Sequence, residues 1–222
     1  MHAMLEPIQS CAPTAQPGTA TVKELTVEPV KVLPLAFPLD DFYARAGLRL
    51  PLIETLEPVA VPEPYRSLLV HHNDMTPTLS AYYARIIHLR VLSRQQRDEF
   101  YFREMVLLAD GREEPVEFGA IRINLGRFTP STRRHILDER VPLGDLLRLD
   151  SVPHSSRPKA FFRLQADALM ADALRLSQPE VLYGRRNTLL DAAHWPVAEV
   201  VEILPPCREP APGYVQERKD YE

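Results

Sequence analysis

The chain has 222 residues, a formal net charge of -4 and 45% hydrophobic residues. This length suits one domain that buries roughly 70% of its unfolded surface, so folding needs no disulfide or metal staple. The slightly acidic balance provides no basic surface, and we expect no nucleic-acid partner. The two cysteines, Cys11 and Cys207, lack metal-type spacing and are expected to be reduced thiols.

Proline dominates the first third of the chain, which holds many of the 22 prolines. Because proline fixes φ and removes a backbone donor, residues 1–35 are predicted to be disordered or loosely wrapped, and residues 34–64 to wrap the domain with short helices. The predicted domain spans residues 36–207, and residues 208–222 are predicted to form a polar tail. Neither a secretory leader nor a run of about 20 apolar residues occurs, so we expect a cytoplasmic protein without a membrane span.

The hydrophobic pattern predicts a single α+β domain with an antiparallel sheet, in which helices are inserted between pairs of strands. Helical spacing and capping residues predict helices within residues 63–72, 73–83, 129–147 (with a break at Pro142) and 167–177. Alternation predicts strands within residues 84–96, 158–167, 180–191 and 195–206, and a hairpin in residues 98–124 around an Asp110-Gly111 turn.

Two adjacent charges interrupt the first strand of that hairpin. Strand side chains alternate between faces, so Arg103 shares a face with Met105 while Glu104 shares the other face with Val106. Each apolar face therefore carries one charge. A charge removed from water costs several kcal/mol unless a partner or ligand compensates it.

Further charges lie inside the predicted strands: Arg122, Arg185, Arg186, Glu199 and Glu202. One interpretation is a set of cross-strand ion pairs on a solvated face, each contributing about 0.2–1 kcal/mol. The alternative is a pocket on the sheet, in which a guanidinium binds a substrate carboxylate and a glutamate contacts a hydroxyl or transfers a proton. We expect Glu104 to be structural and to pair with an arginine of a neighbouring strand.

Other candidate sites have weaker support. The run from His71 to Asp74 contains metal-ligand types, but consecutive side chains point apart, and surface residues at a helix end explain it as well. Ser155-Ser156 lacks a nucleophile elbow, and neither a Walker A motif nor a G-x-G-x-x-G pattern occurs. We therefore expect no metal site and no nucleotide cofactor.

Four segments in order, "NDMTPT", "YFREMVLLADG", "RVPLGDLL" and "LYGRRNTLL…WPVAEVVEILPP", resemble the chorismate lyase (chorismate pyruvate-lyase) family, in particular its stand-alone chorismate lyase-like branch. The resemblance covers about Leu68 to Pro206. It implies an antiparallel sheet with helices closing over a buried site. It also implies a cofactor-independent lyase that eliminates pyruvate from chorismate to give 4-hydroxybenzoate.

The resemblance also implies site residues. Arg103 matches the family's arginine that holds the ring carboxylate, and Met75 and Leu143 match its main-chain contacts. Glu202 best matches the family's glutamate near the ring hydroxyl, although the closing hairpin is longer here and leaves Glu199 as an alternative. Positions 199 and 202 have opposite parity, so only one of them faces the same pocket as Arg103.

Two alternatives to the enzyme remain open. The same fold resembles ligand-sensing domains of some bacterial transcription regulators, which makes a non-catalytic binding module possible. Such regulators carry an N-terminal winged helix-turn-helix, which the proline-rich first sixty residues are not expected to form. The proline-rich segment also allows an interaction protein with an N-terminal recognition arm. The expected partner is the small molecule alone, bound by a monomer or weak dimer.

Overall fold

The computed structural model describes residues 33–207. The predicted C-terminal tail, nearly all of the predicted N-terminal segment and Cys11 lie outside these residues. No helix within residues 33–207 is long and apolar enough to cross a lipid bilayer.

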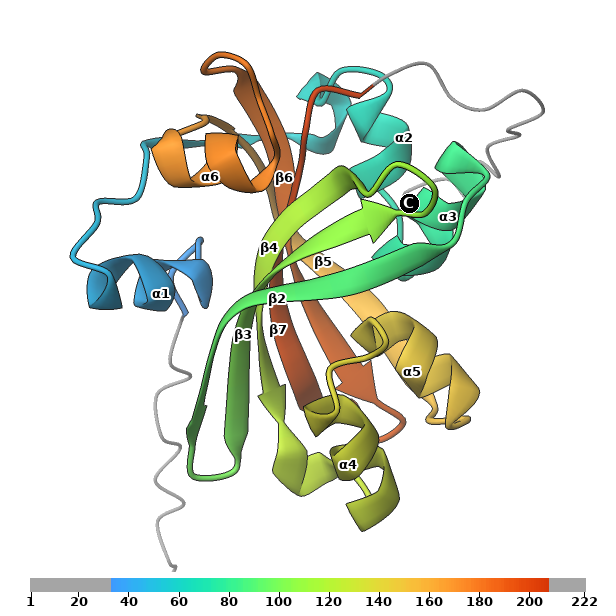
Figure 1. Ribbon diagram of the computed structural model, residues 1–222. Helices are drawn as coiled ribbons and strands as arrows, with labels where there is room; N and C mark the ends of the chain where they lie inside the picture. Colours follow the sequence, from blue (N-terminus) through green and yellow to red (C-terminus); the bar gives the residue numbers. More distant parts are fainter. Residues whose placement is uncertain (1–32, 208–222) are drawn as a thin grey trace, which may run out of the picture. The chain divides into compact units, whose positions relative to one another are not determined.

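A seven-stranded sheet forms the centre of the domain, with the strand order β1-β5-β6-β7-β4-β3-β2 (Figure 1). The strands are β1 (Ile53–Leu56), β2 (Ile87–Arg97), β3 (Phe100–Ala109), β4 (Glu114–Asn124), β5 (His154–Gln165), β6 (Val181–Asp191) and β7 (Pro196–Leu204). Every neighbouring pair is antiparallel. The predicted α+β class with an antiparallel sheet is confirmed.

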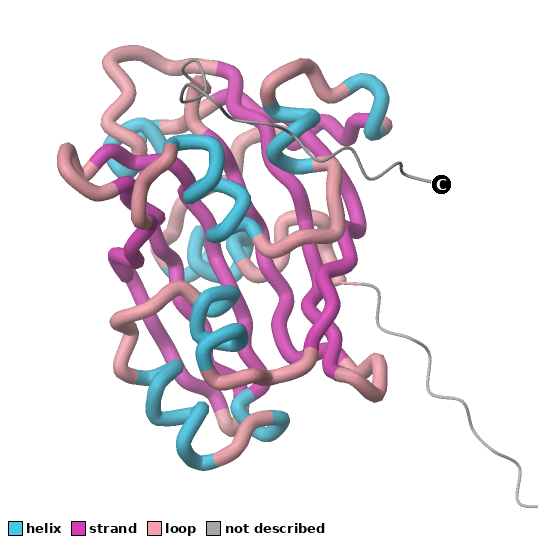
Figure 2. Tube along the Cα trace, turned by 90° about the vertical axis from the view of Figure 1, so that its right-hand side faces the viewer, coloured by secondary structure: helices cyan, strands magenta, loops and turns pink. Residues whose placement is uncertain are grey.

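Helices cover both faces of this sheet. They are α1 (Leu39–Arg45), α2 (Tyr65–Leu69), α3 (Met75–Tyr83), α4 (Pro130–Leu137), α5 (Leu143–Leu149) and α6 (Ala168–Ala173), with short 3-10 turns η1 (Pro58–Ala60) and η2 (Leu125–Arg127). Figure 1 shows α1 and α6 on one side of the sheet and α2 to α5 on the other. In the view onto that second side, helices lie across the strands (Figure 2).

Side-chain caps begin α4 and α6. The sequence predicts the cap of α4, whereas Asp74, at the predicted start of α3, makes no side-chain capping bond. The Thr129 side chain accepts a hydrogen bond from the Thr132 N–H, and Pro130 occupies the first turn of α4, where its missing N–H costs nothing. Asp167 caps α6 by accepting from the Met170 N–H at 2.9 Å. Pro142 separates α4 from α5.

The structure differs from the prediction around β5. Strand β1 was not predicted, because prolines crowd the segment that contains it and it is only four residues long. It pairs with β5 at one edge of the sheet. Strand β5 itself begins at His154, four residues before the predicted start at Pro158, and accommodates this proline by a register shift between Pro158 and Ala160.

Strand β3 is buried on both faces. On the side of α1 and α6, Val106 joins a core that includes Leu39 and Phe118. On the side of α2 to α5, Met105 and its neighbours pack in two further clusters. Neither charge of this strand therefore faces bulk water: Arg103 is 1% exposed and Glu104 is 7% exposed.

Gly119 in β4 allows a close approach of β7. A Cβ at this position would lie 2.2 Å from the carbonyl oxygen of Val201, a backbone atom fixed in the sheet. We expect Gly119→Ala to lower the free energy of unfolding by about 2–3 kcal/mol, because the strands must separate to admit the methyl group. Chemical denaturation of both proteins measures the difference.

Gly126→Ala is the matched control. Its added Cβ would meet the Glu99 carboxylate at 2.5 Å, but this side chain is exposed and can move away. A loss as large for Gly126→Ala as for Gly119→Ala would contradict the backbone explanation.

Candidate functional site

A cavity of about 40 Å³ lies on the sheet face that α2 to α5 cover. Side chains of β3, β4, β6 and β7 contribute to its lining, together with the first residues of α3 and α5. The four residues that the resemblance implies, Met75, Arg103, Leu143 and Glu202, all line it. The cavity has room for roughly three water molecules, so a ring acid needs additional space.

Arg103 brings an unpaired guanidinium to this cavity. Among residues 33–207, neither its Nε nor its Nη1 has a hydrogen-bond partner, and no carboxylate forms an ion pair with it. Burial lowers the pKa of Arg103 to about 10, so the group still carries its charge at neutral pH. A buried cation without a counterion costs several kcal/mol, and an anionic ligand would offset that cost.

In the sheet, Glu202 lies level with Met105, which is two residues along β3 from Arg103. The register pairs Arg103 with Ile121 and Met105 with Gly119, and Gly119 in turn lies opposite Glu202. Two residues along a strand correspond to roughly 7 Å, so the Arg103 and Glu202 positions are offset along the length of the cavity.

Arg185 holds the Glu202 carboxylate. Its Nε donates to Glu202 Oε2, and its Nη1 donates to the carbonyl oxygens of Leu69 and His71, each at 3.1 Å. Its Nη2 donates to the carbonyl oxygen of Asn73 at 3.3 Å. Arg185 is fully buried, and these bonds attach the loop between α2 and α3 to the sheet.

His71 is part of this attachment rather than a simple surface residue at a helix end. Its Nδ1 lies 3.3 Å from Arg185 Nη1 and accepts from the Asn73 N–H at 3.1 Å, while its Nε2 lies 2.7 Å from the Leu68 carbonyl oxygen. Burial and the Arg185 charge lower the pKa of His71 to about 3, so its ring is neutral. Within the described residues, His72 contacts the Ser156 carbonyl instead.

Glu117 was missed by the sequence analysis. It is 1% exposed, lines the cavity, and its Oε2 has no hydrogen-bond partner among the described residues. Burial, followed by the Glu202 charge, raises the pKa of Glu117 well above its ordinary value, although Arg185 opposes the shift. Alternation along "EPVEFGAIRI" contained the signal, because Glu117 has the same parity as Gly119 and Ile121.

Two more polar residues complete the lining. Asn187 donates from Nδ2 to Ser156 Oγ at 2.8 Å, while its Oδ1 has no partner in the part of the chain that the structure describes. Asp74, which precedes α3, accepts a hydrogen bond from His154 at 2.8 Å. Asn187 therefore offers a hydrogen-bonding group to the cavity, whereas Asp74 already has a hydrogen-bond partner in His154.

Glu199 lies on the other face of the sheet. Its Oε2 accepts from Thr188 at 2.9 Å and from Arg186 at 3.2 Å, and neither residue lines the cavity. Of the two alternatives, the structure thus brings Glu202 together with Arg103. The cross-strand ion pairs expected from the sequence are present as Arg185 with Glu202 and Arg186 with Glu199, but both are largely buried rather than solvated.

The expectation that Glu104 pairs with an arginine of a neighbouring strand is wrong. Its cross-strand neighbours are Ser93 and Ala120, and no ion pair joins it to an arginine within residues 33–207. Its Oε1 has no hydrogen-bond partner there, and burial raises its pKa, with a smaller contribution from the Asp167 charge. Arg122 instead stacks on two phenylalanine rings, including Phe37 at 4.9 Å.

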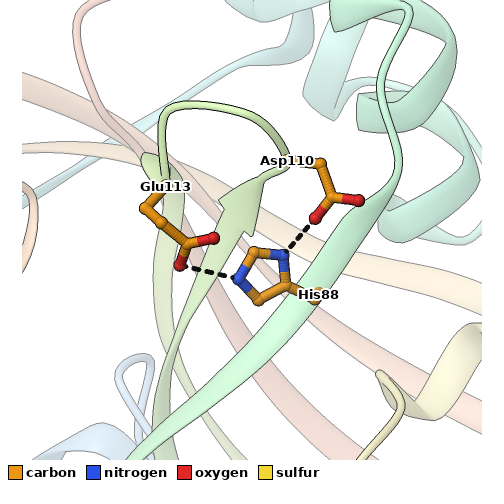
Figure 3. Close-up of side chains that lie close together, drawn as sticks. All are labelled: His88, Asp110 and Glu113. Carbon is orange, nitrogen blue, oxygen red and sulfur yellow. Dashed lines mark hydrogen bonds and ion pairs between the residues drawn. The ribbon is translucent and has the colours of Figure 1, made fainter.

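A histidine between two carboxylates joins β2 to the turn between β3 and β4 (Figure 3). His88 Nδ1 lies 2.8 Å from Asp110 Oδ1, and its Nε2 lies 3.0 Å from Glu113 Oε2. These three residues form a metal-ligand type of group, but both ring nitrogens are engaged by carboxylates, and the two carboxylates are exposed while His88 is half-buried. The arrangement fits a surface clamp on the turn better than a metal centre.

The His154–Asp74 bond should make stability depend on pH. The hydrogen bond to Asp74 raises the pKa of His154 above its ordinary 6.5, so the bond stabilises the fold fully below that value and less as pH rises through the raised pKa. We expect the melting temperature of His154→Ala to fall furthest below wild type near pH 6 and to approach it by pH 9. The difference should vanish in an Asp74→Ala background; a gap that widens with pH would contradict the assignment.

The chain was compared with known families and structures. No protein-family model and no curated protein matches it. PhnF from Mycobacterium smegmatis aligns with a TM-score of 0.49 at 15% identity, over 63% of this chain and 67% of that chain. Its effector domain gives 0.47 at 15% identity over 62% and 91%. The ligand-binding domain of a Bordetella bronchiseptica protein described as a GntR-family transcriptional regulator gives 0.43 at 12% over 54% and 86%. All three TM-scores lie below 0.5, so these alignments do not indicate a function for this chain.

Proposed function

We propose that the cavity binds a cyclic carboxylic acid with its carboxylate on Arg103, and that the acid is chorismate, from which the protein eliminates pyruvate to give 4-hydroxybenzoate. The observation that carries the proposal is the buried guanidinium of Arg103, whose Nε and Nη1 have no partner among the described residues. A guanidinium binds a carboxylate bidentately, so the ligand would supply the missing counterion.

The remaining lining supports a ligand with a polar group away from its carboxylate. Glu202 lies one step along the sheet from Arg103 and would meet the ring hydroxyl. Met75 and Leu143 are the first residues of α3 and α5, where main-chain N–H groups lack acceptors within the helix. We expect these N–H groups to contact ligand oxygens. Because the unliganded cavity is small, α3 and α5 must move away from the sheet to admit a ring.

The elimination needs little covalent help from the protein. The ether C–O bond breaks, the hydrogen on the hydroxyl-bearing ring carbon is lost as a proton, and the ring becomes aromatic. The enolpyruvyl fragment takes up a proton and leaves as pyruvate, so the reaction involves no net oxidation or reduction. Aromatisation supplies driving force, and the protein has to hold the substrate in a reactive conformer and stabilise the developing charge.

A second candidate is non-catalytic binding of a monoanionic aromatic acid. The charges in the cavity favour it, because Glu202 is paired with Arg185 and Asp74 with His154, leaving Arg103 as the one unpaired cation of the described lining. One cation balances a hydroxybenzoate, whereas chorismate carries two carboxylates. Binding of 4-hydroxybenzoate without turnover of chorismate would select this candidate.

Replacing Arg103 should abolish both binding and turnover. With purified wild type and chorismate, we expect chromatography to show 4-hydroxybenzoate and pyruvate in equal amounts. Arg103→Met should lower turnover at least 100-fold and abolish measurable binding of 4-hydroxybenzoate, because the carboxylate loses its counterion in a buried site. Arg163→Met is the control, since Arg163 is exposed and pairs with Glu54 on the sheet edge. Undiminished turnover in Arg103→Met would exclude its role.

The same substitution should stabilise the unliganded protein. Methionine fills much of the space of Arg103 without a buried charge, so we expect the free energy of unfolding to rise by about 1–3 kcal/mol. Arg185→Met should have the opposite effect and cost about 3–5 kcal/mol, because the buried Glu202 carboxylate loses its partner. Denaturant titrations without ligand measure both changes. A large loss of stability in Arg103→Met would show that this arginine is structural.

A further inference from the structure

We propose that Glu117 is a specificity-determining residue of the cavity, whose carboxyl group donates a hydrogen bond to an uncharged oxygen on the ligand ring, at the end away from the carboxylate. The inference rests on the proposed function in one respect, since it requires that the cavity binds a ring acid through Arg103. It adds a requirement for an oxygen substituent on that ring.

The strand register places Glu117 at the opposite end of the cavity from Arg103. Glu117 lies across from Leu107 on β3, whereas Arg103 lies across from Ile121. These two positions on β3, opposite Glu117 and Ile121, are four residues apart, or roughly 13 Å along the strand. The long Arg103 side chain and the shorter Glu117 side chain both line the cavity that lies between them. Gly119, between the two levels, adds no side chain to the floor.

The surroundings of Glu117 favour a proton on its carboxyl group. It is buried, its Oε2 has no partner among the described residues, and Glu202 and Asp74 are further acidic groups of the same lining. Two cations face this region. Arg103 lies at the far end of the cavity, and Arg185 is bound to Glu202. The raised pKa of Glu117 agrees with this environment. A protonated carboxyl is a donor, whereas a carboxylate can only accept.

Glu117 and Glu202 together then complement a hydroxyl group. Glu202, paired with Arg185, can accept a hydrogen bond from the hydroxyl, and Glu117 can donate one to the same oxygen. A ring without this oxygen would leave two buried polar groups unsatisfied. Such a loss weakens binding by roughly 10- to 100-fold.

The test compares 4-hydroxybenzoate with benzoate, which differ only in that hydroxyl, by calorimetric titration of the full chain. Wild type should bind 4-hydroxybenzoate at least 10-fold more tightly than benzoate. Glu117→Leu removes the donor while keeping similar volume, and it should reduce this ratio about 10-fold mainly by weakening 4-hydroxybenzoate. Glu117→Gln keeps an N–H donor and should retain most of the preference.

Each outcome decides between the two proposals. If Arg103→Met loses both acids while Glu117→Leu keeps the wild-type ratio, the carboxylate site stands and the role of Glu117 is overturned. If Glu117→Leu weakens both acids equally, its effect is structural and the specificity role is likewise overturned. If wild type binds neither acid, the proposed function fails and takes this inference with it.

Discussion

The site depends on the ion pair and the hydrogen bonds that the buried guanidinium of Arg185 makes. It joins β6 to β7 through Glu202 and holds the loop before α3 through the carbonyl oxygens of Leu69, His71 and Asn73. The start of α3, which forms part of the cavity wall, is therefore attached to the sheet by the same group that neutralises the carboxylate in the lining. One side chain determines both the position of the wall and the charge behind it.

The two buried arginines, Arg185 and Arg103, differ in role because they differ in their partners. Arg185 is satisfied by the protein and has a structural role, while Arg103 is equally buried but lacks partners for two of its nitrogens among the described residues. Position in the sheet explains the contrast, because Arg185 lies directly opposite Glu202, whereas Arg103 lies between Arg94 and Ile121. Strand register thus leaves Arg103 without a carboxylate partner among the described residues.

Alternation in the sequence was sufficient to predict β3, β4 and β7 and to separate the face of Arg103 from that of Glu104. The motif pattern identified Met75, Leu143 and Glu202, which share the cavity with Arg103. The clamp formed by Arg185 could not be predicted, because its acceptors are loop carbonyls that tertiary structure brings to it. Strand β1 was not predicted because prolines crowd its segment. Glu117 was not predicted either, although alternation places it on the same face as Gly119 and Ile121. That Glu104 has no arginine partner within residues 33–207 depended on register, which alternation alone does not specify.

The adjacency of Arg103 and Glu104 has a consequence for the accuracy of strand pairing. If β3 shifted by one residue, Glu104 would enter the cavity beside Glu117 and Glu202, and Arg103 would move beneath α1 and α6. Four acids, Asp74 among them, would then share one buried space, an arrangement far costlier than the native one. Two opposite charges at consecutive positions thus favour the native register, and the acid ligand proposed for the cavity would bind to that register and be repelled by the shifted one.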